Sequence, residues 1–252
     1  MRRRVFLAGM PALALQAQPE GMKLFLLAGQ SNMAGRGVIT PEDQAPIAGV
    51  FAFNKEMAWA PAVDPLHFDK PIAAVGLARS CARTLLRFAP QQKIGFVPAA
   101  MGGSSLDEWK PGGALFTQAV QRAKAAAPAG TFCGILWHQG EADSGKEELA
   151  RSYTARWVPM MTALRGELGA PELPVVVGQL GEFLRTNEGG SPFCGVVNEH
   201  LAQLPLRARR VAFVSSEGLK DKGDSVHFDT AGLHEFGRRY ALAYMGLDSS
   251  WG

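Results

Sequence analysis

The sequence predicts an α/β protein, a three-layer α/β/α sandwich around a central, mostly parallel five-stranded sheet. Apolar runs of five to seven residues alternate with helical patterns along the chain. The runs are apolar throughout rather than at every second position, which is typical of strands that are covered on both faces. Alternating strands and helices of this kind form a parallel sheet with helices on both sides.

The expected strands, in chain order, are Lys23–Ala28, Lys93–Ala99, Thr131–Trp137, Pro174–Leu180 and Arg210–Ser215. The expected helices are Pro71–Leu86, Ala114–Ala127, Glu147–Leu168 and Ala231–Tyr244. Apolar residues recur in them at helical spacing. Pro71 suits a first helical turn, Pro128 stops the second helix, and Pro159 predicts a kink in the third. Residues Val38 to Lys70 contain four prolines and are expected to form irregular surface loops.

Residues 1–17 differ in kind and have the layout of a signal peptide. Three arginines precede the apolar run from Val5 to Leu15, and small residues follow as in a cleavage region. The run is shorter than the roughly 20 apolar residues that span a bilayer, and its arginines resemble a twin-arginine export signal. We therefore expect export to the periplasm or the extracellular space, with residues 18–252 as one domain. The alternative is a basic tail that is not a leader.

Composition limits the partners. Residues 1–17 hold three of the 26 Lys and Arg and no acid, so the remaining chain carries 23 basic and 23 acidic side chains. Because a nucleic-acid-binding surface needs clustered basic residues, we expect no nucleic-acid partner, and no membrane once the leader is removed.

The odd number of cysteines leaves at least one thiol without a partner in the chain. Cys81, Cys133 and Cys194 are expected to be buried or inert, and the oligomeric state is open.

Polar, glycine-containing clusters directly follow predicted strands at Gly29–Gly37, Met101–Trp109, His138–Asp143 and Asp221–Asp229. Sites in open α/β sheets lie outside the carboxyl ends of the strands, so the clusters are expected to share one edge. Ser31, at a strand-to-helix turn, is the candidate nucleophile, and it needs a base. His227 is the candidate base, because Asp224 can fix one imidazole nitrogen while the other faces Ser31.

An oxyanion needs preorganised hydrogen-bond donors. The backbone N–H of Ser31 is one candidate, and the Gly102-Gly103 pair can present another close to a substrate. Gln139 follows a strand and offers a side-chain NH₂. The alternatives are a tight turn for the glycines and a loop-stabilising role for Gln139.

These motifs resemble one superfamily when they are taken together: GQSNMAGRG, the Gly-Gly-Ser-Ser before Glu108-Trp109, HQGEAD and DSVHF. They are similar to the SGNH hydrolases, in particular the branch of sialate O-acetylesterase-like proteins and family 6 carbohydrate esterases (acetylxylan esterase-like). The run from Trp59 to His67 also resembles that branch, and the similarity extends from about Lys23 to Tyr244.

The resemblance implies a serine esterase that removes O-acetyl groups from carbohydrates by an acyl-enzyme mechanism, without a cofactor or metal. Acetylated xylan-type polysaccharide and O-acetylated sialic acid would both suit it. Ser31 would be the nucleophile, His227 the general base and Asp224 its orienting acid. The Ser31 N–H, the Gly103 N–H and the Gln139 side chain would form the oxyanion hole.

Several other residues in or near these motifs have two possible roles. Glu141 is expected to tie down the oxyanion loop through Arg36 or a backbone amide, and Arg36 alternatively contacts a substrate hydroxyl or carboxylate. Trp109 either stacks on a sugar or lies in the core. Further candidates for substrate contact or support of the site are Gln30, Asn32 and Gly102. His67 with Asp64 either rims the pocket or packs within its loop, and His138 is expected to be a core histidine.

Two other functions would use residues of the same clusters. A metal-dependent hydrolase would use His138, Glu141, Asp143 and His227, but the sequence lacks H-E-x-x-H or clustered Cys/His spacing. A non-catalytic carbohydrate-binding protein is disfavoured because the Ser, Asp, His and Gln set is complete. An α/β-hydrolase is disfavoured because Gly29–Met33 does not complete G-x-S-x-G.

Overall fold

The computed structural model describes residues 19–186 and 190–251, so the predicted leader at 1–17 lies outside them. Strands in the described part form one sheet in the order β3-β2-β4-β1-β5-β6-β7. They are β1 (Met22–Gly29), β2 (Val50–Phe53), β3 (Trp59–Pro61), β4 (Ile94–Pro98), β5 (Gly130–His138), β6 (Val175–Gly178) and β7 (Val211–Val214). β3 is antiparallel to β2, and every other neighbouring pair is parallel.

The α/β prediction is confirmed, but the sheet has seven strands rather than five. β2 and β3 form in the stretch that was expected to be irregular loops. They make a hairpin in which the Ala58 N–H donates to the Asn54 side-chain oxygen (2.9 Å), and β2 adds to the edge of β4. β3 ends on Pro61, which is tolerated at a sheet edge because its missing N–H has no ladder partner there.

The described α-helices are α1 (Ser31–Ala34), α2 (Pro41–Gln44), α3 (Ala78–Phe88), α4 (Ala114–Ala126), α5 (Glu147–Arg151), α6 (Tyr153–Glu167), α7 (Cys194–Arg207) and α8 (Thr230–Leu247). None of the helices in this part of the chain is long and apolar enough to cross a membrane.

Two of the expected helices differ from the structure. The helix predicted from Pro71 begins only at Ala78, because residues 74–75 pair with Gly35 and Gly37 through backbone hydrogen bonds. The helix predicted over Glu147–Leu168 is divided at Ser152, whose hydroxyl donates to the carbonyl of Glu148 (2.7 Å). Pro159, where a kink was predicted, lies inside α6.

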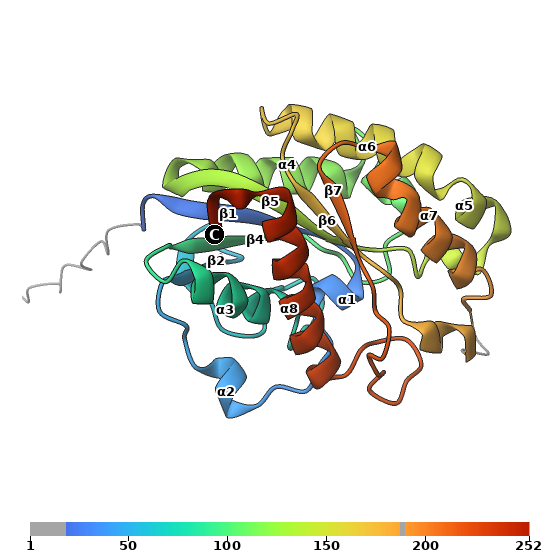
Figure 1. Cartoon of the computed structure of the whole chain (residues 1–252), viewed down its shortest axis with the longest axis horizontal. Coiled ribbons are helices and arrows are strands. Elements are labelled where there is room, and N and C mark those ends of the chain that lie inside the picture. The colour runs from blue at the N-terminus through green and yellow to red at the C-terminus, as the bar shows by residue number, and fades with distance from the viewer. Residues whose placement is uncertain (1–18, 187–189, 252) are drawn as a thin grey trace, which may run out of the picture.

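The helices cover both faces of the sheet (Figure 1). On one face, α4, α6 and α7 pack on an apolar core that contains Leu26, Val97 and Trp137. On the other, α3 and α8 pack together over a core that contains Phe25 and Leu136. Successive residues along a strand therefore point into the apolar cores on opposite faces of the sheet, which explains why the strand runs are continuously apolar. All three cysteines are free; Cys81 and Cys194 are buried, and Cys133 is half-buried.

Candidate active site

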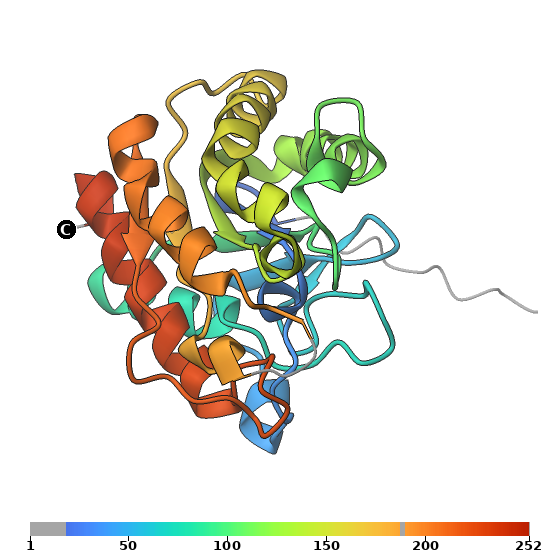
Figure 2. The same ribbon diagram turned by 90° about the vertical axis from the view of Figure 1, so that its right-hand side faces the viewer.

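The four polar clusters meet at the carboxyl edge of the sheet, as predicted, and Figure 2 looks onto that edge. β1 lies between β4 and β5, so the segments that follow these three strands are neighbours. The loop 221–229, between β7 and α8, returns across the same edge and reaches Ser31. One region of the surface therefore gathers residues from four distant parts of the chain.

Ser31 is held at a sharp turn where β1 ends. Gly29 has a φ of +126°, and a Cβ there would lie 2.0 Å from the carbonyl oxygen of His138. The chain then makes the single turn of α1, in which the Gly35 N–H closes back on the Ser31 carbonyl (2.8 Å). As the first residue of this turn, Ser31 has a backbone N–H without an intrahelical acceptor. No other residue in the described ranges accepts a hydrogen bond from it.

Asp224, His227 and Ser31 form a continuous line of hydrogen bonds. His227 Nδ1 is 2.8 Å from Asp224 Oδ2, and His227 Nε2 is 3.0 Å from Ser31 Oγ. With a proton on Nδ1, the imidazole offers Nε2 to the serine hydroxyl as an acceptor. This is the arrangement that activates a serine for attack on a carbonyl carbon.

The carboxylate of Asp224 is fixed by its own loop. Its Oδ1 accepts the backbone N–H groups of Val226 (2.9 Å) and His227 (2.8 Å). Burial opposes ionisation, but hydrogen bonds from the His227 side chain and from these two amides outweigh it and lower the pKa of Asp224 to about 2. Asp224 therefore remains a carboxylate at any pH at which the protein is expected to function.

Asn32 holds the histidine loop in place from the nucleophile side. Its side-chain oxygen accepts the Phe228 N–H (3.1 Å), and its amide nitrogen donates to the Val226 carbonyl (3.1 Å). Val226 and Phe228 are the residues before and after His227 in the chain, so Asn32 holds the backbone on both sides of His227. The same amide donates to Glu141 (2.6 Å). Asn32 is 1% exposed and supports the site rather than contacting substrate.

Glu141 is anchored by Asn32 and His138, not by Arg36. Its Oε1 lies 3.3 Å from the Nε2 of His138, which is fully buried as expected for a core histidine. Burial works against the charged form of Glu141, yet interactions with His138 and Asn32 lower its pKa. Glu141 thus acts as a buried carboxylate that orients Asn32.

In the part of the chain that the structure describes, the segment from Met101 to Ser104, after β4, presents one free amide. The Gly102 N–H donates to Asp69 Oδ2 (2.9 Å), and the Ser104 N–H donates to the Met101 carbonyl (3.2 Å). Gly103, between them, has a φ of +81°, and its N–H has no acceptor among residues 19–186 and 190–251. A glycine is suited to this left-handed position, which L side chains rarely adopt.

Gln139 does not present its amide to this opening. Its Nε2 donates to Asp143 Oδ2 (2.5 Å) and to the Ser104 carbonyl (3.0 Å), while its Oε1 accepts the Tyr153 hydroxyl (3.0 Å). The side chain is completely buried. The expectation that Gln139 is a side-chain oxyanion donor is therefore not supported by the geometry, which gives its amide a loop-stabilising role.

Gln30 is the glutamine at the opening. Its Oε1 is approached by the N–H of Ala142 (3.3 Å), the N–H of Gly140 (3.5 Å) and the Nε2 of Gln139 (3.4 Å). The two backbone N–H groups fix the orientation of the amide, since the hydrogens of Gln139 Nε2 are directed to Asp143 and Ser104. The NH₂ of Gln30 donates to no side chain or backbone group in the described chain, and Gln30 lines the same cavity as Ser31.

Arg36 forms a buried ion pair with Asp69 instead of reaching Glu141. Its Nη2 lies 2.7 Å from Asp69 Oδ2, and its Nη1 donates to the Gly35 carbonyl (2.7 Å). A Cβ on Gly102 would lie 2.4 Å from Arg36 Nη2, so a larger residue there would require the ion pair to shift. Asp69 was missed because it stands alone in a proline-rich stretch with no motif around it.

A cavity of about 440 Å³ opens over these groups. Its lining residues include Gln30, Ser31, Arg36, Lys70, Gly102, Gly103, Glu141, Ala142, Ser191, Val226 and His227. A volume of this order suits a small ligand such as a sugar unit.

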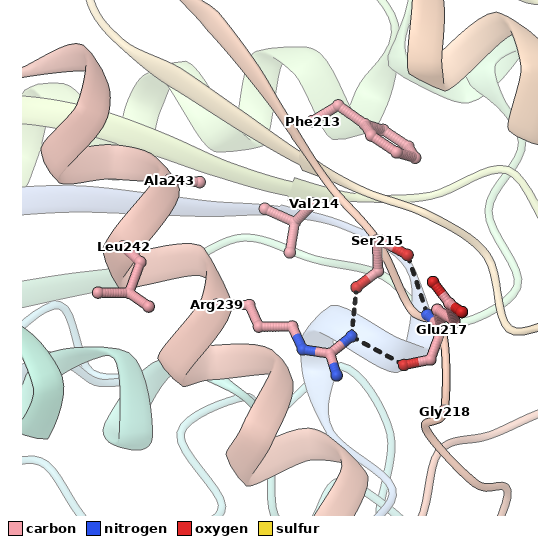
Figure 3. Close-up of a pocket in the computed structure, with 8 residues that line it drawn as sticks. All are labelled: Phe213, Val214, Ser215, Glu217, Gly218, Arg239, Leu242 and Ala243. Carbon is pink, nitrogen blue, oxygen red and sulfur yellow. Dashed lines mark hydrogen bonds between the residues drawn. The ribbon is translucent and has the colours of Figure 1, made fainter.

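A larger hollow, about 630 Å³, lies apart from the predicted residues (Figure 3). It runs between the edge strand β7 and α8, where Arg239 donates to the carbonyls of Ser215 and Glu217 (both 2.9 Å). None of the residues that line it was a candidate for chemistry, so cavity size alone does not locate the site.

Of the two interpretations given for Trp109, and for His67 with Asp64, the structure favours the internal one. Trp109 is fully buried, packs edge-to-face on Trp137 and donates to the Ser104 hydroxyl (3.0 Å), so it belongs to the core. His67 is buried, which lowers its pKa to about 4, and Asp64 pairs with Arg79 instead of rimming the cavity.

The four residues weighed as metal ligands serve other partners. Asp143 accepts from Gln139 and from Arg156 (2.6 Å), and His227 binds Asp224 and Ser31. Across the described ranges, no three His, Cys, Asp or Glu side chains are grouped so as to hold a metal ion.

Comparison with known proteins identifies the family of the chain. The family model described as carbohydrate esterase, sialic acid-specific acetylesterase matches residues 21–246. A probable carbohydrate esterase of Arabidopsis thaliana is 30% identical over 243 residues, which cover 88% of this chain and 90% of that protein. Its crystal structure superimposes with a TM-score of 0.81 at 29% identity, over 90% of this chain and 98% of the other.

Two more distant structures share the fold. NanS has a TM-score of 0.73 at 20% identity, over 91% of this chain and 98% of NanS. A carbohydrate acetylesterase from Xanthomonas citri has a TM-score of 0.69 at 21% identity, over 90% of this chain and 57% of that larger chain.

Because the pKa of Asp224 is lower in the folded protein than in the unfolded chain, its ionisation contributes a pH-dependent part of the free energy of unfolding. The substitution Asp224→Asn should remove that part. A carboxyl group that titrates near 2 when folded and near 3.8 when unfolded stabilises the fold above pH 4, and this contribution disappears as the pH falls toward 2. The difference in free energy of unfolding between the native protein and Asp224→Asn should shrink as the pH falls from 4 to 2. Urea unfolding across this range measures it. A difference that does not change with pH would contradict the ionised, hydrogen-bonded Asp224.

Proposed function

Because the chain belongs to the sialic acid-specific acetylesterase family of carbohydrate esterases, we propose that it removes O-acetyl groups from carbohydrates with Ser31 as nucleophile. The observation that carries the proposal is the hydrogen-bonded line from Asp224 through His227 to Ser31 Oγ, beside the cavity. A hydroxyl is a poor nucleophile until a base removes its proton, and this line supplies the base and its orienting carboxylate.

The reaction has two steps. His227 Nε2 takes the proton of Ser31 as Oγ bonds to the acetyl carbonyl carbon, and the carbonyl oxygen becomes an oxyanion. The intermediate collapses, the bond to the sugar oxygen breaks, and His227 gives its proton to that oxygen. Water then attacks the acetyl-enzyme, losing a proton to His227, and acetate leaves as the proton returns to Ser31. Asp224 stabilises the imidazolium in both steps.

Three donors surround the position of the oxyanion in this proposal. The backbone N–H groups of Ser31 and Gly103 are free at the cavity, and the oriented NH₂ of Gln30 is the third. Gln30 takes the role that the sequence motif suggested for Gln139. Gln139 instead supports the arrangement, because it binds the carbonyl of Ser104 next to Gly103.

Lys70 favours an acidic sugar as substrate. It lines the cavity, and its Nζ would be 3.8 Å from a Cβ on Gly103. No carboxylate in the part of the chain described here forms an ion pair with Lys70. A cation at the cavity that pairs with none of the described carboxylates would attract a substrate carboxylate, so we propose O-acetylated sialic acid before neutral acetylated xylan. Residues 1–17 would direct the enzyme to the compartment where such glycans occur.

Acetate release from a panel of acetylated glycans tests the function. The purified chain without residues 1–17 should release acetate, most efficiently from the acidic sugar. Ser31→Ala should fold normally and lose about 10³-fold or more of the native rate, since loss of a triad member leaves only binding and the oxyanion hole. Ser191→Ala is the matched control, because Ser191 lines the same cavity without contacting His227. Near-native acetate release by Ser31→Ala would remove Ser31 from the mechanism.

The assignment of Gln30 is tested by Gln30→Glu. Glutamate keeps an oxygen for the Gly140 and Ala142 amides but replaces the donor with a negative group facing the oxyanion. We expect kcat to fall roughly 10²–10³-fold, the usual cost of losing one oxyanion donor. A kcat within a few-fold of the native value would show that the third donor is not Gln30.

A further inference from the structure

We infer that Asp69 is a positioning residue for the reaction: its carboxylate holds the Gly102 amide and, through Arg36, ties this amide to the helix that carries Ser31. The inference rests on the proposed function and identifies what keeps the Gly103 N–H in place. Asp69 belongs to none of the motifs that indicate the nucleophile, the base or the oxyanion donors.

The loop needs an external restraint. Two successive glycines have more backbone freedom than any other pair of residues. An oxyanion donor contributes only when it is already aimed at the developing charge. Of the four amides from Met101 to Ser104, those of Met101, Gly102 and Ser104 are bound to Gly29, Asp69 and Met101, and that of Gly103 alone is free in the described chain.

Asp69 restrains the loop from one side. A charged acceptor gives a stronger hydrogen bond than a neutral one, and Asp69 Oδ2 receives the Gly102 N–H at 2.9 Å. On the other side, Gln139 donates to the Ser104 carbonyl at 3.0 Å. The free Gly103 N–H lies between these two fixed points, so its direction is set by both.

The Asp69–Arg36 pair also links the two halves of the site. Arg36 Nη1 donates to the carbonyl of Gly35, the residue that ends the turn beginning at Ser31. The path from the nucleophile to the oxyanion donor is thus a short chain of contacts through Gly35, Arg36, Asp69 and Gly102. The relative position of Ser31 and Gly103 depends on it.

Stability does not account for this ion pair. The two side chains are 2% and 1% exposed, and burying such a pair costs desolvation that its attraction often does not exceed. Arg36 Nε and Asp69 Oδ1 are buried without hydrogen-bond partners among the described residues, which adds to the cost. Burying this ion pair costs free energy, yet the pair is bound to the loop that carries the proposed oxyanion donor. We therefore infer that its role is to position that loop.

The test compares Asp69→Ala and Asp69→Asn with a matched pair elsewhere. Asp64 forms a similarly buried ion pair with Arg79 and does not contact the loop 102–104, so Asp64→Asn is the control. The concentration of active sites is measured by covalent labelling with a fluorophosphonate, and kcat is calculated per labelled site. Unfolded protein is not labelled and therefore does not lower the measured kcat. We expect kcat to fall about 10–100-fold in Asp69→Ala and less in Asp69→Asn, which keeps an oxygen toward Gly102.

Other readouts separate positioning from general damage. KM and the pH profile of kcat/KM should stay close to native in the Asp69 variants, because the Ser31–His227–Asp224 line is untouched. Asp64→Asn should leave kcat per site close to native, because Asp64 pairs with Arg79 and does not contact the loop 102–104. If native enzyme is active and both Asp69 variants keep kcat within two-fold, the inference is overturned while the proposed function stands. If native enzyme releases no acetate from any glycan, the proposed function itself fails.

Discussion

The site depends on a close approach of two backbones. At the end of β1, Gly29 lies so near to His138 at the end of β5 that a Cβ on Gly29 would be 2.0 Å from the His138 carbonyl oxygen. The same carbonyl accepts the Gln30 N–H (2.8 Å), so the chain turns at this point and begins α1 at Ser31. The positions of Gln30, Ser31 and the loop after His138 all follow from this contact, which only glycine permits.

Buried carboxylates then place the reacting groups without adding free charge to the cavity. Glu141, Asp143 and Asp69 each accept hydrogen bonds from neutral donors and also pair with a histidine or an arginine. Glu141 orients Asn32 and through it the loop of His227, and Asp143 holds Gln139 against the Ser104 carbonyl. Their pairing with His138 and Arg156 offsets part of the cost of burial. The result is a cavity wall of aimed hydrogen-bond donors around a single nucleophile, which is what stabilisation of an oxyanion requires.

The sequence was sufficient for the layers and for the edge at which the site lies, because apolar runs define five of the seven strands, β1 and β4 to β7. It failed for β2 and β3, which are four and three residues long and include Pro61. It also failed for the start of α3, since the pairing of residues 74–75 with 35–37 is a long-range event that no local pattern records.

In the site, Ser31, His227 and Asp224 could be expected to meet because spacing and strand ends constrain them. The choice between Gln30 and Gln139 could not be made from spacing. Both follow strand ends, and only the surrounding donors and acceptors decide which amide faces the cavity. Asp69 was beyond sequence reasoning, because its role arises from a contact with Gly102 across 33 positions of the chain.

The most direct test is a crystal structure of the protein after reaction with a fluorophosphonate, whose phosphoryl oxygen takes the place of the oxyanion. The account predicts a covalent bond to Ser31 Oγ. It also predicts that the phosphoryl oxygen lies about 2.7–3.1 Å from the Ser31 amide, the Gly103 amide and Gln30 Nε2, with Gln139 still bound to Ser104 and Asp143. A label on another residue, or a phosphoryl oxygen bound by Gln139 and not by Gln30, would contradict it.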